Sequence, residues 1–383
     1  MDVRFIKPEE AVDFLKVSST SFIWKFDEKV DDHVDTPVMA VFDNGKLISG
    51  LEAIDFECNY CGTSLGTIGI GCVCCLPEAR RMGAVRAMFD KIGETALEHN
   101  WTLGFLHPFS IEYYEQFGYA HLNQLHTIKV PFANLNHIPR NTNAILYTGE
   151  QFEELSALHN KCVLLENLLT YRKDKKCFCD KPHENTDYTY FRRNEKGEAD
   201  AYVRFTVSRP NTLTVDDLYF LTPEALFGIL GFLRNYDGIV KELIIRRQYQ
   251  GSPYSLLADR ISGEQYSWDG CMAARIYDIK KVLESNIYPE EHGSFRIKSI
   301  DKFEQNCGIF EVEYENGKGM VTKHKDGKYD ISLEPHAAAR LLLAGESHNA
   351  FSASFLDGVE LNGDAKNFFK SFPNRPTRFT DSF

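Results

Sequence analysis

Residues 37–76 carry short apolar runs broken at regular intervals by turn residues. The segment PVMAVFDNGKLISGLEAIDFECNYCGTSLGTIGIGCVCCL is interrupted at Asp43-Asn44-Gly45 and again at Cys61-Gly62. Apolar runs joined by such turn signals are typical of β-hairpins. We therefore predict an antiparallel meander in this part of the chain.

After the meander, the spacing of hydrophobic positions changes from that of a strand to that of a helix. Residues 77–100 read as a helix that begins at Pro77, and the apolar stretch WTLGFLHPF comes next. In SIEYYEQFGYA, residues 110–120, a short helix is expected to end at Gly118, because glycine is favoured just after a helix. Residues 1–125 are thus predicted to form one α+β domain.

Residues 126–277 repeat this order of elements. DAYVRFTV and NTLTVDDLYFL have the composition of strands, and TPEALFGILGFLRNY is a capped helix closed by Asp237-Gly238, followed by the apolar strand VKELIIRR. The helix start has neither the arginines nor the glycine found in the first domain. This part is predicted to be a degenerate copy that lacks an anion site.

Residues 278–383 are predicted to form a third α+β segment. The stretch GIFEVEYENGKGMVTKHKDGKYDISL contains strands split at Asn316-Gly317 and Asp326-Gly327, and the helical EPHAAARLLLAG follows. Phe372, Phe379 and Phe383 lie in the polar tail. Three aromatic residues there predict that the tail is packed, although chain ends usually fray.

Composition narrows the classes of partner. The 43% hydrophobic and 13% aromatic content predicts folded structure throughout. The net charge of −12 argues against nucleic acid, which needs a basic face, and favours cationic partners. No signal peptide is recognisable, and no apolar run approaches the roughly 20 residues that span a bilayer. We expect a cytoplasmic protein without a membrane partner.

The ten cysteines are predicted to be reduced thiols of the core. Cys58 and Cys61 have the spacing of metal ligands, and Cys72, Cys74 and Cys75 follow. No second CxxC or histidine pair completes a zinc set, so we expect no metal site.

The stretch LPEARRMGAVRAMFDKI, residues 76–92, joins an apolar strand to a helix through two arginines and a glycine. The first N–H groups of a helix and its dipole attract anions. Gly83 would let a phosphate approach the backbone, and Arg80, Arg81 and Arg86 would add charge. The pattern predicts a pyrophosphate site, with a solvated basic surface as the alternative. It is neither a P-loop nor a Rossmann fingerprint.

The motif Arg80-x-x-Gly83-x-Val85 resembles the acetyl-CoA loop of the GNAT acetyltransferases, with Val85 in place of the usual glycine or alanine. LHPFSIEYYEQFGY is similar to the segment of that family that carries a catalytic tyrosine. Together the two stretches resemble the Eis-like branch, named for enhanced intracellular survival. This resemblance implies an α+β protein with two GNAT-like mixed-sheet domains in tandem, residues 1–125 and 126–277, and a sterol-carrier-protein-like domain at residues 278–383. Family members commonly form homo-oligomers, often hexamers.

The resemblance also assigns the acetyl-CoA ligands. A strand that splays from its neighbour would bind the pantetheine arm, a loop and helix start would bind the pyrophosphate, and the next segment would touch the cofactor. These residues are Val73, Cys74 and Cys75; Arg81, Met82, Gly83, Ala84, Val85 and Arg86; and Phe109 and Ser110.

The implied reaction is direct attack of a primary amine on the acetyl thioester. Tyr114 matches the general acid of the family, with Tyr113 and Tyr119 as competing candidates; a phenol is protonated at neutral pH and so can donate a proton. In Eis-like enzymes the base is the C-terminal carboxylate, here that of Phe383, which returns to the active site. The alternative is a free tail.

Four further residues are predicted to bind the acceptor amine. His107 is expected to line the pocket, with general-base chemistry as a second possibility. Trp24, Phe26 and Asp27 could supply aromatic walls and negative charge for an aminoglycoside, a polyamine or a lysine side chain, or could form a solvated acidic loop. A non-catalytic acetyl-CoA sensor and a carrier of an apolar ligand in the third domain are the competing functions.

Overall fold

The structure is a computed structural model of the full chain. It describes residues 1–27, 29, 31–122, 125–178, 187–208, 211–248, 257, 263–269, 272–346, 349–363, 365–375 and 377–381. The chain forms two compact units. The first contains Met1–Leu122, Met272–Asn374 and the last residues from Asp381, and the second contains Asn123–Cys271 and Arg375–Thr380.

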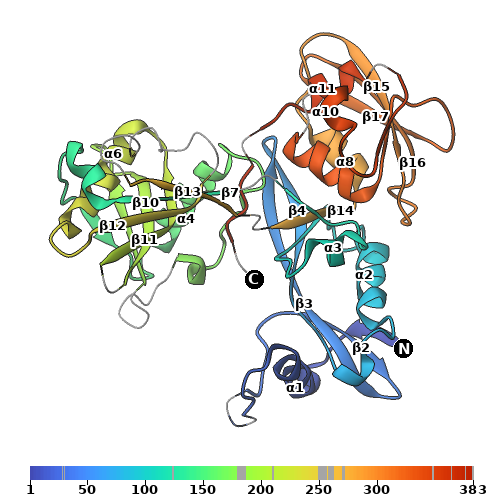
Figure 1. The fold of residues 1–383 in the computed structure, drawn as a ribbon, viewed down its shortest axis with the longest axis horizontal. Coiled ribbons are helices and arrows are strands. Elements are labelled where there is room, and N and C mark those ends of the chain that lie inside the picture. Colours follow the sequence, from blue (N-terminus) through green and yellow to red (C-terminus); the bar gives the residue numbers. More distant parts are fainter. Residues whose placement is uncertain are drawn as a thin grey trace. The chain divides into compact units, whose positions relative to one another are not determined.

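The first unit is built on a seven-stranded mixed sheet with the order β1-β2-β3-β4-β5-β14-β6 (Figure 1). The predicted meander is confirmed, because β2, β3 and β4 pair in antiparallel fashion. β5 then joins β4 in parallel. The strands are β1 (Asp2–Phe5), β2 (Val38–Asp43), β3 (Lys46–Tyr60), β4 (Thr63–Cys75), β5 (Leu103–Leu106), β6 (Ala120–His121) and β14 (Ala273–Ile276).

Helices cover both faces of this sheet, and Figure 1 shows α1 and α2 on either side of the long strand β3. α1 (Ala11–Phe22) buries Phe14 and Val17 in one apolar cluster. α2 (Ala84–Thr95) buries Met88, Phe89 and Ile92 in a second cluster on the opposite face. The spacing of these buried positions places them on one side of each helix, which explains why the helices lie flat on the sheet. The short helix α3 (Ile111–Glu115) follows β5.

The structure differs from the sequence prediction in two details of this unit. Residues 77–79 form a 3-10 turn, and the helix begins only at Ala84, because Arg81 and Gly83 have φ values of 65° and 87°. Strand β14 pairs with β5 and β6 in the first sheet, whereas the predicted boundary at residue 277 assigns it to the second domain. Strand β14 follows the second unit in the sequence and completes the first sheet.

The second unit has its own seven-stranded sheet, with the order β13-β7-β12-β11-β10-β9-β8. Its β11 and β12 pair in parallel, as β4 and β5 do in the first unit. The elements are β7 (Leu125–Pro131), β8 (Ala144–Leu146), α4 (Phe152–Val163), β9 (Asp187–Arg193), β10 (Ala199–Ser208), β11 (Thr212–Phe220), α6 (Pro223–Leu233), β12 (Glu242–Gln248) and β13 (Gln265–Asp269).

A five-stranded sheet with the order β17-β16-β15-β18-β19 belongs to the first unit. Asn316 and Gly317 form its predicted tight turn, both with positive φ. Its elements are α8 (Ile279–Ser285), β15 (Gly293–Ser299), β16 (Gly308–Glu315), β17 (Lys318–His324), β18 (Ile331–Leu333), α9 (Pro335–Ala338), the π-helical η6 (Ala339–Ala344), α10 (Ala350–Ala353), β19 (Val359–Leu361) and α11 (Lys366–Ser371).

Within the described ranges, no helix has the length and apolar character needed to cross a bilayer. The same ranges contain no group of three or more histidine, cysteine or acidic side chains placed to hold a metal ion.

Candidate functional site

Strand β4 extends five residues beyond its parallel pairing with β5. Their parallel pairing runs from Thr67 with Leu103 to Ile70 with Leu106 and stops there. On the other side of β4, the pairing with β3 shifts register between Gly50 and Glu52, and Cys72 takes a left-handed φ of 47°. Because β5 ends at Leu106, the last residues of β4 have no pairing with β5, and the bulge changes their direction.

The end of β4 is held in place by hydroxyl groups from neighbouring elements. The Ser21 hydroxyl at the end of α1 accepts from the Cys75 N–H and donates to the Cys75 carbonyl, both at 3.1 Å. From β3, the Ser49 hydroxyl donates to the Cys74 carbonyl at 2.7 Å. These bonds fix a strand end that β5 no longer supports.

The turn between β4 and α2 presents the start of a helix. Gly83 is the N-cap of α2, and no side chain there accepts from the first helical N–H groups. Its φ of 87° is one that glycine adopts without strain. The backbone donors of α2 and the positive end of its dipole are thus open to an anion.

A cavity of about 760 Å³ lies beside the end of β4 and this helix start. Its walls are formed by nine of the predicted cofactor ligands and seven further residues. The predicted residues are Val73, Cys74, Cys75, Arg81, Gly83, Ala84, Val85, Arg86 and Phe109, and the others are Ser21, Phe22, Ala79, Arg80, Tyr113, Gln116 and Phe117. Met82 and Ser110 are not among the lining residues.

Arg86 is held at the cavity by two residues of the turn after α3. Its guanidinium donates to the Gln116 side chain and lies 5.2 Å from the centre of the Phe117 ring. Gln116 in turn donates to the Tyr113 carbonyl at 2.8 Å. A guanidinium fixed in this way is suited to a phosphate, since less side-chain entropy remains to be lost on binding.

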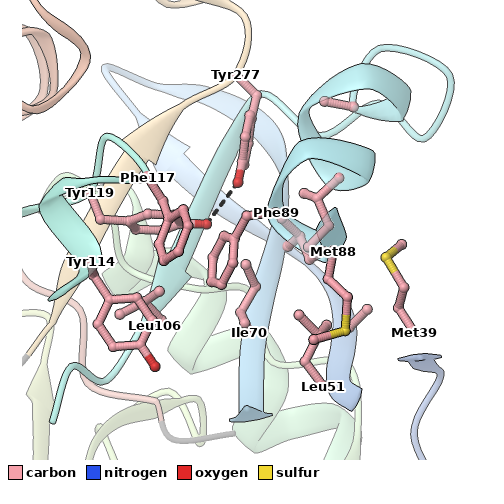
Figure 2. Packing of buried hydrophobic residues seen from close by; sticks show 14 of the residues in the cluster. Met39, Leu51, Ile70, Met88, Phe89, Leu106, Tyr114, Phe117, Tyr119 and Tyr277 are labelled. Atoms are coloured by element: carbon pink, nitrogen blue, oxygen red, sulfur yellow. Dashed lines mark hydrogen bonds between the residues drawn. The ribbon is translucent and has the colours of Figure 1, made fainter. Parts of the chain in front are cut away.

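The three candidate tyrosines differ in their surroundings (Figure 2). Tyr119 is fully buried, and its hydroxyl lies 2.9 Å from that of Tyr277. Neither Tyr119 nor Tyr114 is among the residues that line the cavity. Tyr113 lines the cavity. Tyr114 is 3% exposed and packs against Phe89, and Figure 2 shows its hydroxyl pointing away from the Tyr119–Tyr277 bond.

Burial raises the pKa of Tyr114 well above that of an ordinary phenol, with a smaller effect from Tyr113. The structure shows no hydrogen bond to the Tyr114 hydroxyl from any residue that it describes. The group therefore stays protonated at neutral pH and keeps its donor, as a general acid must. Its assignment as the acid stays a prediction.

The predicted acceptor residues lie apart from the cavity walls. Trp24 and Phe26 form a ring pair with centres 6.2 Å apart, and Asp27 donates its N–H to the Asp31 carboxylate at 2.7 Å. His107 is exposed at the end of β5. The segment bearing Trp24 follows directly on Ser21 and Phe22, which do line the cavity.

Sequence reasoning missed several cavity residues. Ser21 and Phe22 precede Cys75, at the end of β4, by more than 50 residues, and no local pattern connects them to it. Gln116 and Phe117 could have been proposed, because they belong to the quoted EQFGY segment next to the tyrosines.

Phe383, whose carboxylate is the predicted base, lies outside the described residues. The tail before it is packed in the second unit, as the sequence predicts. Arg378 forms a 3.0 Å ion pair with Glu166 and stacks on the Tyr219 ring at 4.4 Å, and the Thr380 hydroxyl lies 3.0 Å from that of Tyr219.

The second unit lacks the corresponding helix start. Thr222 caps α6 with its own side chain, which accepts from the Ala225 N–H. The cap occupies a donor that an anion would use, in agreement with the predicted degenerate copy.

Two family models match the chain. Residues 2–122 match an acetyltransferase (GNAT) domain, and residues 170–276 match a second acetyltransferase (GNAT) domain. The chain belongs to the GNAT acetyltransferases. The two matches together span more than half of its length and confirm the predicted tandem of GNAT domains. A search of curated proteins finds no match.

Solved structures of the same fold align with 98–100% of this GNAT chain. A probable N-acyltransferase from Enterococcus faecalis V583 is 18% identical, with a TM-score of 0.86 over 100% of this chain and 99% of that one. Eis1 from Mycobacterium abscessus is 17% identical, with a TM-score of 0.76 over 100% and 99%. A GCN5-related N-acetyltransferase from Anabaena variabilis ATCC 29413 is 17% identical, with a TM-score of 0.82 over 98% of each chain. At the level of the fold, these likenesses confirm the Eis-like prediction.

Gly83→Ala is expected to raise the Kd for acetyl-CoA by about tenfold in a calorimetric titration. A left-handed conformation costs an L-residue about 1–2 kcal/mol, and relieving it would turn the first N–H groups of α2 away from the cavity. Gly62→Ala is the matched control, because Gly62 has a φ of 85° and open space at its Cβ position but lies in the β3–β4 turn. Equal Kd values for the two variants would contradict the assignment of this helix start.

Proposed function

We propose that this GNAT protein transfers the acetyl group of acetyl-CoA to a primary amine of a polycationic acceptor. The observation that carries the proposal is the cavity beside the end of β4, beyond its pairing with β5, and the uncapped start of α2. Strand backbone there is suited to the amide groups of pantetheine, and the helix start with Arg81 and Arg86 is suited to the pyrophosphate.

The reaction consists of one attack and two proton transfers. An acceptor ammonium loses its proton and attacks the thioester carbonyl, and the tetrahedral intermediate then expels the coenzyme A thiolate. Tyr114 supplies the proton to that thiolate, and its raised pKa keeps it in the acid form until then. The C-terminal carboxylate of Phe383 accepts the ammonium proton and attracts the cation.

The acidic balance of the chain supports a cationic acceptor. The net charge is −12, and Asp27, Asp31, Asp32 and Asp35 lie in the segment that follows the cavity residues of α1. An aminoglycoside, a polyamine and a lysine peptide share the chemistry of several ammonium groups on one molecule. We also propose that the third sheet belongs to a sterol-carrier-protein-like domain and that the cytoplasmic chain assembles as a homo-oligomer, for which a hexamer is the first state to test by light scattering.

The test measures free thiol released from acetyl-CoA by the purified protein in the presence of each acceptor class. A parallel calorimetric titration measures acetyl-CoA binding alone. We expect binding together with amine-dependent release. Binding without release by any acceptor would favour an acetyl-CoA sensor, and no binding would refute the site.

Adding a few residues after Phe383 is expected to lower turnover by about a hundredfold or more, while the Kd for acetyl-CoA stays unchanged. The extension replaces the carboxylate with a neutral amide and moves the charge away from its site. An extension of the N-terminus by the same residues is the control. An extended C-terminus with normal turnover would refute the base assignment.

A further inference from the structure

Three cysteines lie in the last four residues of β4, and two of them share a face of the strand. Cys74 belongs to the apolar cluster under α1, and Cys72 packs against the same cluster. Val73, which lies between them, packs on the opposite face and lines the cavity. Cys74 also lines the cavity, so the pair borders the proposed cofactor site directly.

Polar groups around the two thiols activate one of them. The Cys72 sulfur lies 3.1 Å from the Ser18 hydroxyl, and Cys74 donates to the Gly50 carbonyl at 3.4 Å. The neighbouring Cys74 side chain, and to a smaller degree the Ser18 hydroxyl, lowers the pKa of Cys72. The same contact and burial raise the pKa of Cys74. Cys72 is half-buried, so a small oxidant can reach the more acidic thiol.

The backbone permits a bond between these two residues. Residues two apart on a strand have Cα atoms about 6.6 Å apart, near the upper limit of about 6.8 Å for a disulfide. Cys72 departs from the extended conformation with a φ of 47°, which shortens the span. Both thiols are free in this structure.

We propose that Cys72 and Cys74 form an oxidative modification site at which a hydroperoxide closes a disulfide and weakens acetyl-CoA binding. The Cys72 thiolate attacks the peroxide, the O–O bond breaks, and a sulfenic acid and one water (or an alcohol) are formed. The Cys74 thiol then attacks the Cys72 sulfur and releases a water. The two thiols lose two electrons and two protons in total, and the peroxide is reduced.

Closure changes the cavity through Val73. The two sulfur atoms must come to a covalent distance of about 2.05 Å, and the backbone between them must move with them. Cys74 also gives up its proton and with it the bond to the Gly50 carbonyl. The strand end that would hold the pantetheine arm is therefore displaced in the oxidised protein.

The experiment treats the reduced full-length protein with hydrogen peroxide and measures intact mass, the cysteines in the new bond and the Kd for acetyl-CoA. We expect the loss of two hydrogen atoms, a Cys72–Cys74 linkage, and a Kd raised by about tenfold or more that a dithiol reductant restores. Cys307→Ser, which removes an exposed thiol away from β4, should behave as the wild type. Cys72→Ser, Cys72→Ala and Cys74→Ser should keep their Kd after peroxide, and thermal melts of the three establish that they fold.

Three outcomes would overturn the proposal. The two thiols could remain reduced at peroxide levels that oxidise Cys307, the bond could form without a change in Kd, or the Cys72 variants could still lose affinity after peroxide. The affinity readout rests on the proposed acetyl-CoA site, whereas the mapped linkage does not. Absence of acetyl-CoA binding in the reduced protein would refute the proposed function and leave the mass measurement to decide whether the disulfide forms.

Discussion

Asp301→Ala is expected to lower the free energy of unfolding of the first unit by about 3–5 kcal/mol, because it leaves a buried arginine without its counter-ion. Asp301 accepts two bonds from Arg275 at 2.8 and 2.9 Å, and both side chains are 3% exposed. The arginine stacks on Phe303 at 4.9 Å. Urea unfolding followed by tryptophan fluorescence and circular dichroism measures the change.

The loop after β15 that carries Asp301 also provides the control. Lys302 pairs with Asp90 of α2 at the surface, with side chains 43% and 38% exposed. Such pairs contribute about 0–1 kcal/mol, so Lys302→Ala should change stability little. The double variant Arg275→Met/Asp301→Leu should recover part of the loss, since no unpaired charge remains buried. A cost below about 1 kcal/mol for Asp301→Ala would show that water reaches the arginine.

The same ion pair connects the third sheet to the cavity within the first unit. Arg275 donates to the carbonyl of Phe117, which lines the cavity and lies against Arg86. Phe303 packs against Gly93 of α2, where a Cβ atom would collide with its ring. The segment after residue 277 therefore supports the elements that form the candidate site, in addition to any function of its own.

Local patterns predicted the parts of the site that are close in sequence. The meander, the glycine before α2 and the tyrosine helix all follow from turn chemistry and periodicity over short windows. The start of α2 was predicted too early, since nothing in the sequence distinguishes Arg81, with its left-handed φ, from a helical arginine. The geometry of the turn, and not local helix propensity, determines where α2 begins.

Long-range pairings lie beyond such reasoning. The short apolar sequence of β14 would suit either sheet, and only tertiary contacts determine that it pairs with β5. Ser21 reaches the Cys75 backbone across 54 positions of sequence. The resemblance to the GNAT family identified most of the cavity-lining residues, because a family motif carries information about contacts that one sequence alone does not.

Tyr114→Phe is expected to lower turnover by about a hundredfold or more while the Kd for acetyl-CoA stays within about twofold of the wild type. The ring contacts with Phe89 and Phe109 remain, so the packing is preserved and only the proton donor is lost. Steady-state thiol release gives turnover, and calorimetry gives the affinity.

Two neighbouring tyrosines separate the loss of an acid from the loss of a structural hydroxyl. Tyr119→Phe removes the bond to Tyr277 and should reduce stability by about 1 kcal/mol with turnover nearly unchanged. Tyr113→Phe keeps a ring at the cavity wall and should change turnover by less than about threefold. If Tyr113→Phe shows the large loss and Tyr114→Phe does not, the acid is Tyr113.

Because the Tyr114 pKa is raised, the wild-type rate should not fall through loss of its proton below about pH 10, the ordinary phenol pKa. An alkaline limb below that pH must therefore come from another group.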